Sequence, residues 1–222
     1  YPGPYGNWGS RKYLMASLDQ SLSRMGLDYV DVFYSHRFDP DTPLEETLQA
    51  LVDIVRRGKA LYAGISRWPL EATRFALDYL RRHDTPCLLY QGRLNMIDRE
   101  PADRGVLDEV ASGGAGFVSF SPLAQGLLTD RYLEGVPAGS RISLGRSLPE
   151  SRLTPEFIEK IRKLNVLASD RGQTLAEMAL GWVLNDRRVT SVIVGCSSVG
   201  QMGDIVKAVD CAAFTARELE II

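Results

Sequence analysis

The chain has 222 residues, of which 45% are hydrophobic, enough to bury a substantial core. Its 26 basic and 28 acidic residues give a formal net charge of −2, so no basic field exists to hold nucleic acid or an anionic membrane. The three cysteines are odd in number and lack C-x-x-C spacing, which favours a reducing cytoplasm over secretion. No apolar run is long enough to cross a bilayer, so membrane insertion is not expected.

The first ten residues, YPGPYGNWGS, are typical of the middle of a loop. They have neither the charged n-region nor the apolar h-region of a signal peptide, and they lack an initiator methionine. We therefore expect the chain to be a fragment or a partial record of a longer protein.

Short apolar segments alternate with amphipathic ones along the chain. In 10–27, leucines recur at four-residue steps and share one helical face with Met25. Ser10 is a candidate N-cap for this helix and Gly26 a candidate stop. In the later segment 173–185, Thr174 is a candidate cap, with Glu177 three residues on at the spacing of a capping box. The predicted helices, in chain order, cover 10–27, 43–59, 69–82, 105–112, 154–171, 173–185 and 199–209. The predicted strands cover 30–36, 60–66, 116–123 and 189–198, and the segment 87–95 is predicted to begin as a strand.

Two features concern the organisation of the whole chain. The segment 129–152 is rich in Gly, Pro, Ser and Arg and is long for a connection, which favours a functional or mobile segment. Elsewhere neither a low-complexity tract nor a clean linker interrupts the alternation, so 1–222 is predicted to be a single, partial barrel domain.

Five strands, each followed by a helical segment, predict a parallel sheet covered by helices on both faces. A doubly wound sheet and a (β/α)8 barrel both fit this pattern. Polar or small residues follow the apolar runs of successive strands, as in Ser35-His36 and Gly195-Cys196-Ser197. A barrel assembles its site from the loops at that face, whereas a doubly wound sheet usually carries G-x-G-x-x-G after its first strand. The chain has no such motif, which favours the barrel.

The motif YSH at 34–36 places His36, one of only two histidines, where a buried strand gives way to a loop. A lone histidine at such a place most often bonds the neighbouring backbone. An imidazole aimed at the mouth of a barrel can instead donate a hydrogen bond to a substrate carbonyl. The position at a strand end favours the second interpretation. The other histidine, His83, lies in a helix-ending RRHD cluster and is expected to be solvated.

Two further strand ends carry polar side chains, Ser66 in GISRW and Gln91 in YQGRLN. A hydroxyl and an amide at neighbouring strand ends can hold a carboxamide, because their donors and acceptors match it. Either residue could instead cap the helix that follows.

Two turns have the composition of a nucleotide site. In FSPLAQGLLTDRY, Phe120 offers a ring face for stacking, Ser121 begins a run of amides that can bond phosphate oxygens, and Gly126 allows close backbone approach. In VGCSSVGQMGD, small residues precede a helix N-terminus, which attracts phosphate. A core phenylalanine and ordinary glycine turns would account for the same letters.

Taken together and in order, these segments resemble the aldo-keto reductase family. The resemblance rests on GPYG, RMGLDYVDVFYSHR, RRGKALYAGISRW, FSPLAQGLLTDRY and VTSVIVGCSS, and it covers nearly the whole chain. It is strongest with the branch that contains bacterial glyceraldehyde-3-phosphate and methylglyoxal reductases and the β-subunits of voltage-gated potassium channels.

The resemblance implies a (β/α)8 barrel that binds NADPH in an extended pose and transfers a hydride to an aldehyde or ketone. The family's catalytic set is Asp, Tyr, Lys and His, and His36 matches the histidine. Asn95 is expected near the substrate. The implied cofactor contacts run from the nicotinamide to the adenosine end: Ser66, Arg67, Gln91, Phe120, Ser121, Pro122, Leu123, Gly126, Arg131, Arg141, Gly195, Ser197, Gln201 and Asp204.

The chain also departs from the family pattern. The catalytic Asp, Tyr and Lys would all precede Tyr1, so about five of the eight βα units of the barrel are expected here. The family prefers asparagine where Ile205 stands, and its relatives often have arginine in place of Ser198. The 2′-phosphate would then be held differently, although NADPH rather than NADH is the expected cofactor.

These observations predict a cytoplasmic, NADPH-dependent reductase of small aldehydes or ketones resembling methylglyoxal or glyceraldehyde 3-phosphate. Its expected partner is a small-molecule carbonyl substrate, with no nucleic acid and no membrane insertion, and a homo-oligomer is compatible with the sequence. The main alternative is an NADP(H)-binding regulatory β-subunit of a potassium channel with little turnover. A barrel enzyme of another reaction class, such as a lyase, is a third hypothesis.

Overall fold

A computed structural model describes residues 8–145 and 147–222 as an α/β protein with five strands, hydrogen-bonded as neighbours in chain order. The strands are β1 (Val30–Ser35), β2 (Ala60–Ser66), β3 (Cys87–Arg93), β4 (Gly116–Phe120) and β5 (Val189–Ile193). The helices are α1 (Arg11–Met25), α2 (Leu44–Arg56), α3 (Leu70–Arg82), α4 (Glu100–Asp103), α5 (Val106–Ser112), α6 (Pro155–Asp170), α7 (Leu175–Asn185), α8 (Val199–Lys207) and α9 (Ala216–Ile221). The predicted alternation of strands and helices is therefore confirmed.

The described residues form two compact units. Unit 1 comprises the residues up to Gly92 together with Pro101–Val118, and unit 2 comprises Arg93–Glu100 and Ser119–Ile222. The assignment of the chain to one domain stays a prediction. Each unit is described below by itself.

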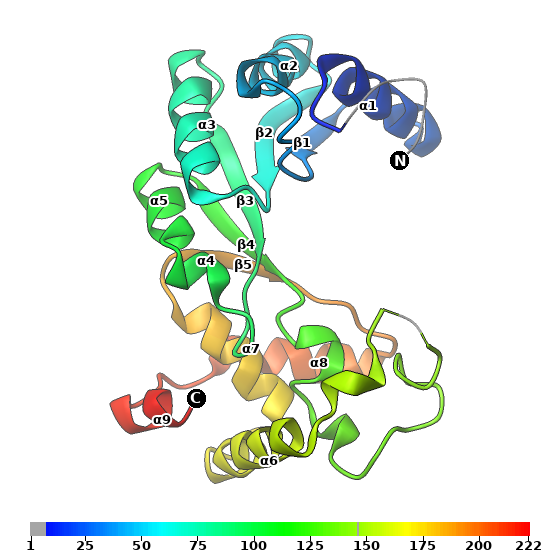
Figure 1. Ribbon diagram of the computed structural model, residues 1–222, viewed down its shortest axis with the longest axis vertical. Coiled ribbons are helices and arrows are strands. Elements are labelled where there is room, and N and C mark those ends of the chain that lie inside the picture. The colour runs from blue at the N-terminus through cyan, green and yellow to red at the C-terminus, as the bar shows by residue number, and fades with distance from the viewer. Residues whose placement is uncertain (1–7, 146) are drawn as a thin grey trace. The chain divides into compact units, whose positions relative to one another are not determined.

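In unit 1, α1 and α2 pack against the strands β1 and β2, and α3 packs between α2 and α5 (Figure 1). The Ser10 hydroxyl caps α1 by accepting a hydrogen bond from the Tyr13 N–H at 3.3 Å, and Gly26 ends the helix with φ +66°. Both predictions are confirmed. The leucines of α1 are buried against Ala50 and Ile54 of α2, but Met25, predicted on the same face, is 52% exposed.

The register of the parallel strands in unit 1 aligns the candidate site residues. Tyr34 of β1 is opposite Gly64 of β2, and Ser66 of β2 is opposite Gln91 of β3. A Cβ added to Gly64 would lie 2.7 Å from two ring carbons of Tyr34, so only glycine lets the tyrosine ring cross β2. The carboxyl ends of these strands therefore meet at one edge of the unit.

Unit 2 is built around an apolar cluster that joins α6 and α7 to the segments before them. Thr174 and Glu177 form the predicted capping box at the start of α7. Tyr132, Ile142 and Leu148 are buried in the same cluster. The long segment 129–152 thus contributes to the core of unit 2 and contains two short 3-10 turns.

The C-terminal residues of unit 2 are held by Arg171, which follows α6. Its guanidinium donates hydrogen bonds to the Glu218 carboxylate and to the Ala212 carbonyl, both at 2.6 Å. It also lies 4.2 Å from the centre of the Phe214 ring. The side chain of Arg171 is only 9% exposed, so this contact set attaches α9 to the body of the unit.

Three strands end earlier than predicted. β1 ends at Ser35 instead of residue 36, β4 at Phe120 instead of 123, and β5 at Ile193 instead of 198. In each case the residues after the strand leave the ladder. None of the helices in the described ranges is both long and apolar enough to span a bilayer.

Candidate active site

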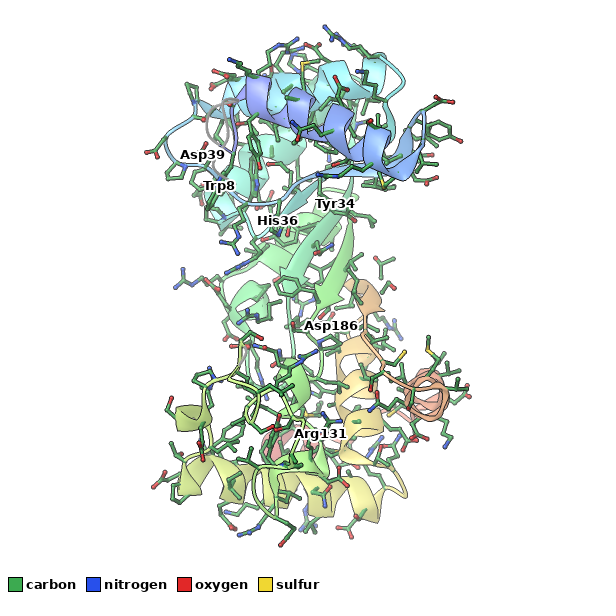
Figure 2. The ribbon with its side chains drawn as sticks, turned by 90° about the vertical axis from the view of Figure 1, so that its right-hand side faces the viewer. Trp8, Tyr34, His36, Asp39, Arg131 and Asp186 are labelled. Atoms are coloured by element: carbon green, nitrogen blue, oxygen red, sulfur yellow. The ribbon has the colours of Figure 1, made fainter. Side chains whose placement is uncertain are left out.

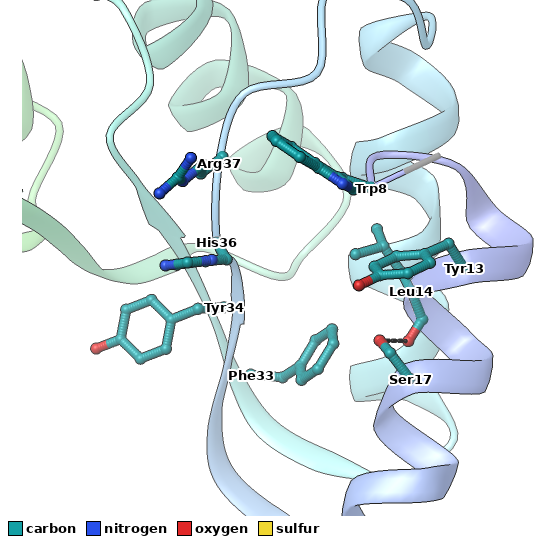
Figure 3. Close-up of a pocket in the computed structure, with 8 residues that line it drawn as sticks. All are labelled: Trp8, Tyr13, Leu14, Ser17, Phe33, Tyr34, His36 and Arg37. Atoms are coloured by element: carbon teal, nitrogen blue, oxygen red, sulfur yellow. Dashed lines mark hydrogen bonds between the residues drawn. The ribbon is translucent and has the colours of Figure 1, made fainter. Parts of the chain in front are cut away.

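His36 lies in the first turn after β1 and lines a cavity of about 380 Å³ in unit 1 (Figures 2 and 3). Figure 3 shows the imidazole on the same side of the chain as Tyr34, while Phe33 points toward α1. The His36 side chain is exposed and hydrogen-bonds to no other described residue. Its ring nitrogens are therefore available to a ligand.

The loop after β1 is tied to the segment that precedes α1. The Gly9 N–H donates to Asp39 Oδ2 at 2.9 Å, and the Thr47 hydroxyl donates to the Gly9 carbonyl at 2.7 Å. A Cβ on residue 9 would lie 2.8 Å from both Asp39 Cβ and Thr47 Oγ1, so a larger residue would break the contact. This clasp fixes Trp8, the residue before it, at the mouth of the cavity.

Asp39 is 8% exposed and remains charged inside the clasp. Burial alone would raise its pKa, but hydrogen bonds from the Gly9 N–H, the Thr42 hydroxyl and the Asp41 N–H lower the pKa below the usual value for aspartate. Because these donors use both carboxylate oxygens, Asp39 acts here as a structural anchor of the loop.

Ser66, Arg67 and Gln91 come together at the ends of β2 and β3, as predicted. Ser66 is 2% exposed and pairs in register with Gln91. The Arg67 N–H donates to the Gln91 carbonyl at 3.0 Å, and Arg67 has φ +58°. A non-glycine residue in this region is uncommon and marks a backbone held by its surroundings. The turn directs the guanidinium outward while the hydroxyl stays buried.

The Tyr34 phenol and the Cys87 thiol are both held neutral in unit 1. Burial, followed by the proximity of Cys87, raises the pKa of Tyr34. Burial likewise raises the pKa of Cys87 to about 12. Neither group is prepared to act as a nucleophile near pH 7.

In unit 2, Asn95 organises the turn that follows β4. Its amide Nδ2 donates to the Ser121 carbonyl at 3.0 Å, and its Oδ1 accepts from the N–H groups of Ile97 and Asp98 at 2.9 and 2.8 Å. The side chain is fully buried. Its predicted contact with the substrate stays a prediction, since the structure shows a side chain committed to its own loop.

The turn from Ser121 to Gly126 has an unusual backbone. Ser121, Ala124, Gln125 and Gly126 all have positive φ, at +52°, +46°, +62° and +100°. Such clustered conformations persist only where surrounding contacts impose them, and they are frequent at ligand sites. The ring of Phe120, at the start of the turn, is half-buried, with the Arg93 guanidinium 5.6 Å from its centre. Pro122 is buried and Leu123 packs on the core of unit 2.

The remaining predicted residues of unit 2 lie on exposed segments. The N–H and hydroxyl of Ser197 both donate to Gln201 Oε1, at 2.9 and 3.1 Å, which joins the two residues at the start of α8. Asp204 pairs with Lys207 at 2.9 Å, and Gly195 is exposed. The side chains of Arg131 and Arg141 are exposed and form no ion pair with any described carboxylate.

Three residues around the cavity were not predicted: Trp8, Arg37 and Asp39. The Arg37 guanidinium lies 5.7 Å from the centre of the Trp8 ring. An acid and a base directly after a strand-ending histidine, in SHRFD, were the available signal. The role of Trp8 depends on a contact between residues about 30 positions apart, which periodicity does not report. His83, expected to be solvated, instead stacks on Tyr79 with ring centres 4.1 Å apart and bonds its carbonyl.

The whole chain, residues 1–222, matches the Aldo/keto reductase family model. It is 48% identical over 223 residues to the L-glyceraldehyde 3-phosphate reductase of Escherichia coli, covering 99% of this chain and 64% of that protein. It is 35% identical over 213 residues to a probable voltage-gated potassium channel subunit beta of Arabidopsis thaliana, covering 94% and 65%. The chain thus spans slightly under two thirds of the length of these curated relatives.

The fold comparison agrees. The crystal structure of a thermostable aldo-keto reductase in complex with the inhibitor epalrestat superposes with a TM-score of 0.72 at 25% identity, covering 96% of this chain and 66% of that one. The predicted fold class, an α/β barrel type of which this chain holds about five βα units, is confirmed. The chain belongs to the aldo/keto reductase family.

Proposed function

We propose that this chain is part of an NADPH-dependent reductase of small aldehydes and ketones, with glyceraldehyde 3-phosphate or methylglyoxal as the type of substrate. The observation that carries the proposal is the position of His36. It follows a parallel strand directly, lines a cavity and has no protein partner among the described residues. The relative at 48% identity, named as a reductase of L-glyceraldehyde 3-phosphate, supports the same class of reaction.

In this proposal His36 contacts the substrate directly. Its ring N–H donates a hydrogen bond to the carbonyl oxygen, which orients the carbonyl and stabilises the negative charge that develops there. NADPH, when bound, would supply the hydride that bonds to the carbonyl carbon, which would give an alcohol and NADP+. The carbonyl oxygen also needs a proton, which the family resemblance assigns to a tyrosine.

The proposed cofactor contacts fall within elements that suit them chemically. In unit 1, the strand pairing brings Ser66 and Arg67 beside Gln91, and a hydroxyl and an amide are groups that can bond a carboxamide. In unit 2, the Phe120 ring is half-buried, and the turn that follows holds Ser121, Pro122, Leu123 and Gly126. Glycine at residue 126 allows close approach of a pyrophosphate.

The groups proposed to meet phosphate and adenosine are the exposed ones of unit 2. Arg131 and Arg141 lack carboxylate partners among the described residues, so they are free to pair with phosphate oxygens. Gly195, Ser197, Gln201 and Asp204 are the proposed contacts at the adenosine end. Ser198 caps α8 by accepting a hydrogen bond from the Gln201 N–H at 3.2 Å, and a helix N-terminus is an end of the helix that favours an anion.

An assay of the complete gene product tests the proposal. The protein is mixed with NADPH and an aldehyde panel that includes methylglyoxal and glyceraldehyde 3-phosphate, and the absorbance of the reduced nicotinamide is followed. We expect turnover of at least one small aldehyde, and a weaker affinity for NADH than for NADPH. If the protein binds NADPH but turns over no aldehyde of the panel, the proposed reductase activity is refuted.

A second candidate function is a regulatory subunit that binds NADP(H) as a sensor. The 35% identity to a probable voltage-gated potassium channel subunit beta favours it. It predicts NADPH binding with very slow turnover, and co-purification with a transmembrane protein from the source cells. Rapid turnover of an aldehyde by the isolated gene product would exclude a purely regulatory role.

A further inference from the structure

We propose that Arg37 binds an anionic group of the substrate, a phosphate monoester, and thereby selects phosphorylated aldehydes over neutral ones. The inference rests on the proposed reductase function and concerns the cavity of unit 1 that His36 lines. It assigns to Arg37 a specificity role next to the histidine that contacts the carbonyl.

The charges around the cavity point to an anion. Its described lining includes the aromatic side chains of Trp8, Tyr13 and Phe33, with His36 and Arg37, and no described lining residue is acidic. The Arg37 guanidinium lies beside apolar side chains and has no opposing carboxylate among the described residues, so it is suited to pair with an anionic ligand. A phosphate dianion supplies the missing charge.

The Arg37 side chain is exposed and unneutralised. It forms no ion pair with any described carboxylate, although Asp39 is only two positions away. The oxygens of Asp39 accept instead from Gly9, Asp41 and Thr42. The clasp therefore withdraws the nearest acid from Arg37 and leaves the guanidinium free for a ligand.

The orientation of Arg37 is set by Trp8. The guanidinium lies 5.7 Å from the centre of the indole, within the range of a cation–π contact. Figure 3 shows the indole beside Arg37, and the guanidinium projecting to the side of the chain on which His36 lies. The Trp8 indole thus lies beside the Arg37 guanidinium, whose N–H groups can donate two hydrogen bonds to one oxyanion.

The size of the cavity fits this use. At about 380 Å³ it is large enough for a triose phosphate. His36 and Arg37 are adjacent in sequence, so a ligand that reaches both is short. A three-carbon aldehyde with a terminal phosphate has its carbonyl at one end and its anion at the other.

The test compares two substrates in the complete gene product. Arg37→Gln removes the charge with little change in volume. We expect this variant to raise KM for glyceraldehyde 3-phosphate by at least about tenfold, because a charge-assisted hydrogen bond to phosphate is lost. We expect kcat/KM for the neutral substrate methylglyoxal to change less than about twofold. Arg37→Lys keeps the charge but loses the fork, so its KM should lie between the other two.

Arg24→Gln is the matched control. Arg24 is an exposed arginine in the last turn of α1 and does not line the cavity. It should leave both substrates unchanged. Calorimetric titration with glycerol 3-phosphate, which cannot be reduced at a carbonyl, gives a readout independent of turnover. Binding should be detectable in the wild type and weakened by Arg37→Gln.

The outcomes separate this inference from the proposed function. Equal effects of Arg37→Gln on both substrates, or a weaker affinity for NADPH with unchanged glycerol 3-phosphate binding, would overturn the anion role of Arg37. Turnover of methylglyoxal with no binding of glycerol 3-phosphate would overturn it as well, while the reductase function stands. If the protein binds glycerol 3-phosphate through Arg37 but reduces no aldehyde, the anion site is supported and the proposed reductase function is refuted.

Discussion

The two units hold their candidate site residues by different means. In unit 1, Ser66 and Gln91 are placed by the parallel pairing of β2 with β3, and His36 follows β1 directly. In unit 2, Phe120 ends β4, but Ser121 lies in a turn where its carbonyl accepts a hydrogen bond from the buried side chain of Asn95. A site held by strand pairing depends on packing along the sheet, whereas a site held in a turn depends on individual buried hydrogen bonds.

Asn95→Ala should break the unit 2 arrangement with the largest effect. It removes the donor to the Ser121 carbonyl and leaves the N–H groups of Ile97 and Asp98 without their acceptor. We expect a loss of about 3 kcal/mol in the free energy of unfolding, measured by urea denaturation of the complete gene product. Asn185→Ala, at an exposed position at the end of α7, should change it by less than about 0.5 kcal/mol. Equal effects of the two variants would refute the special role of Asn95.

Gly64→Ala tests how tightly the Tyr34 ring packs on β2 in unit 1. The new Cβ would lie 2.7 Å from the Tyr34 ring and 3.1 Å from the Leu89 carbonyl oxygen. We expect a destabilisation of about 2 kcal/mol, from the same urea measurement, since the ring has to move off the sheet. Gly203→Ala in α8 is the control, because a Cβ there meets no atom within 4 Å. That variant should be neutral or slightly stabilising, as alanine favours a helix. A neutral Gly64→Ala would show that the Tyr34 ring is not packed as described.

The smallest expected effect concerns acid stability in unit 2. Hydrogen bonds from the Thr215 N–H and from Arg171 hold the pKa of Glu218 at about 2, below its ordinary value of 4.5. Because the pKa in the folded state is depressed, the stabilisation is present above pH 4.5 and is lost as pH falls toward 2. Thermal unfolding midpoints measured across this range should fall less steeply for Glu218→Gln than for the wild type. Parallel curves for the two proteins would show that Glu218 contributes nothing to acid sensitivity.

Sequence patterns predicted the elements that carry the site better than the turns between them. The alternation of apolar strands and amphipathic helices located all five described strands, and Ser10, Gly26 and Thr174 marked helix ends through local hydrogen bonds. These signals lie within a few residues of one another. The four-residue helix α4 was missed because it is too short to show a period.

The contacts that shape the candidate site could not be predicted in the same way. The hydrogen bonds of Gly9 with Asp39 and Thr47 join residues that are 30 and 38 positions apart in sequence. The positive φ values that begin at Ser121 are imposed by tertiary contacts on residues that do not favour them. The family resemblance predicted the site residues one by one, but it did not predict the hydrogen bonds that hold them in place.

Replacement of each of the two histidines tests whether His36 orients a carbonyl for reduction by NADPH. In the complete gene product, kcat for glyceraldehyde 3-phosphate is measured in His36→Gln and in His83→Gln, which alters the histidine that stacks on Tyr79 in α3. We expect a loss of about a hundredfold in kcat for His36→Gln with an unchanged Kd for NADPH, and no comparable loss for His83→Gln. Full activity of His36→Gln would refute the proposed contact between His36 and the carbonyl.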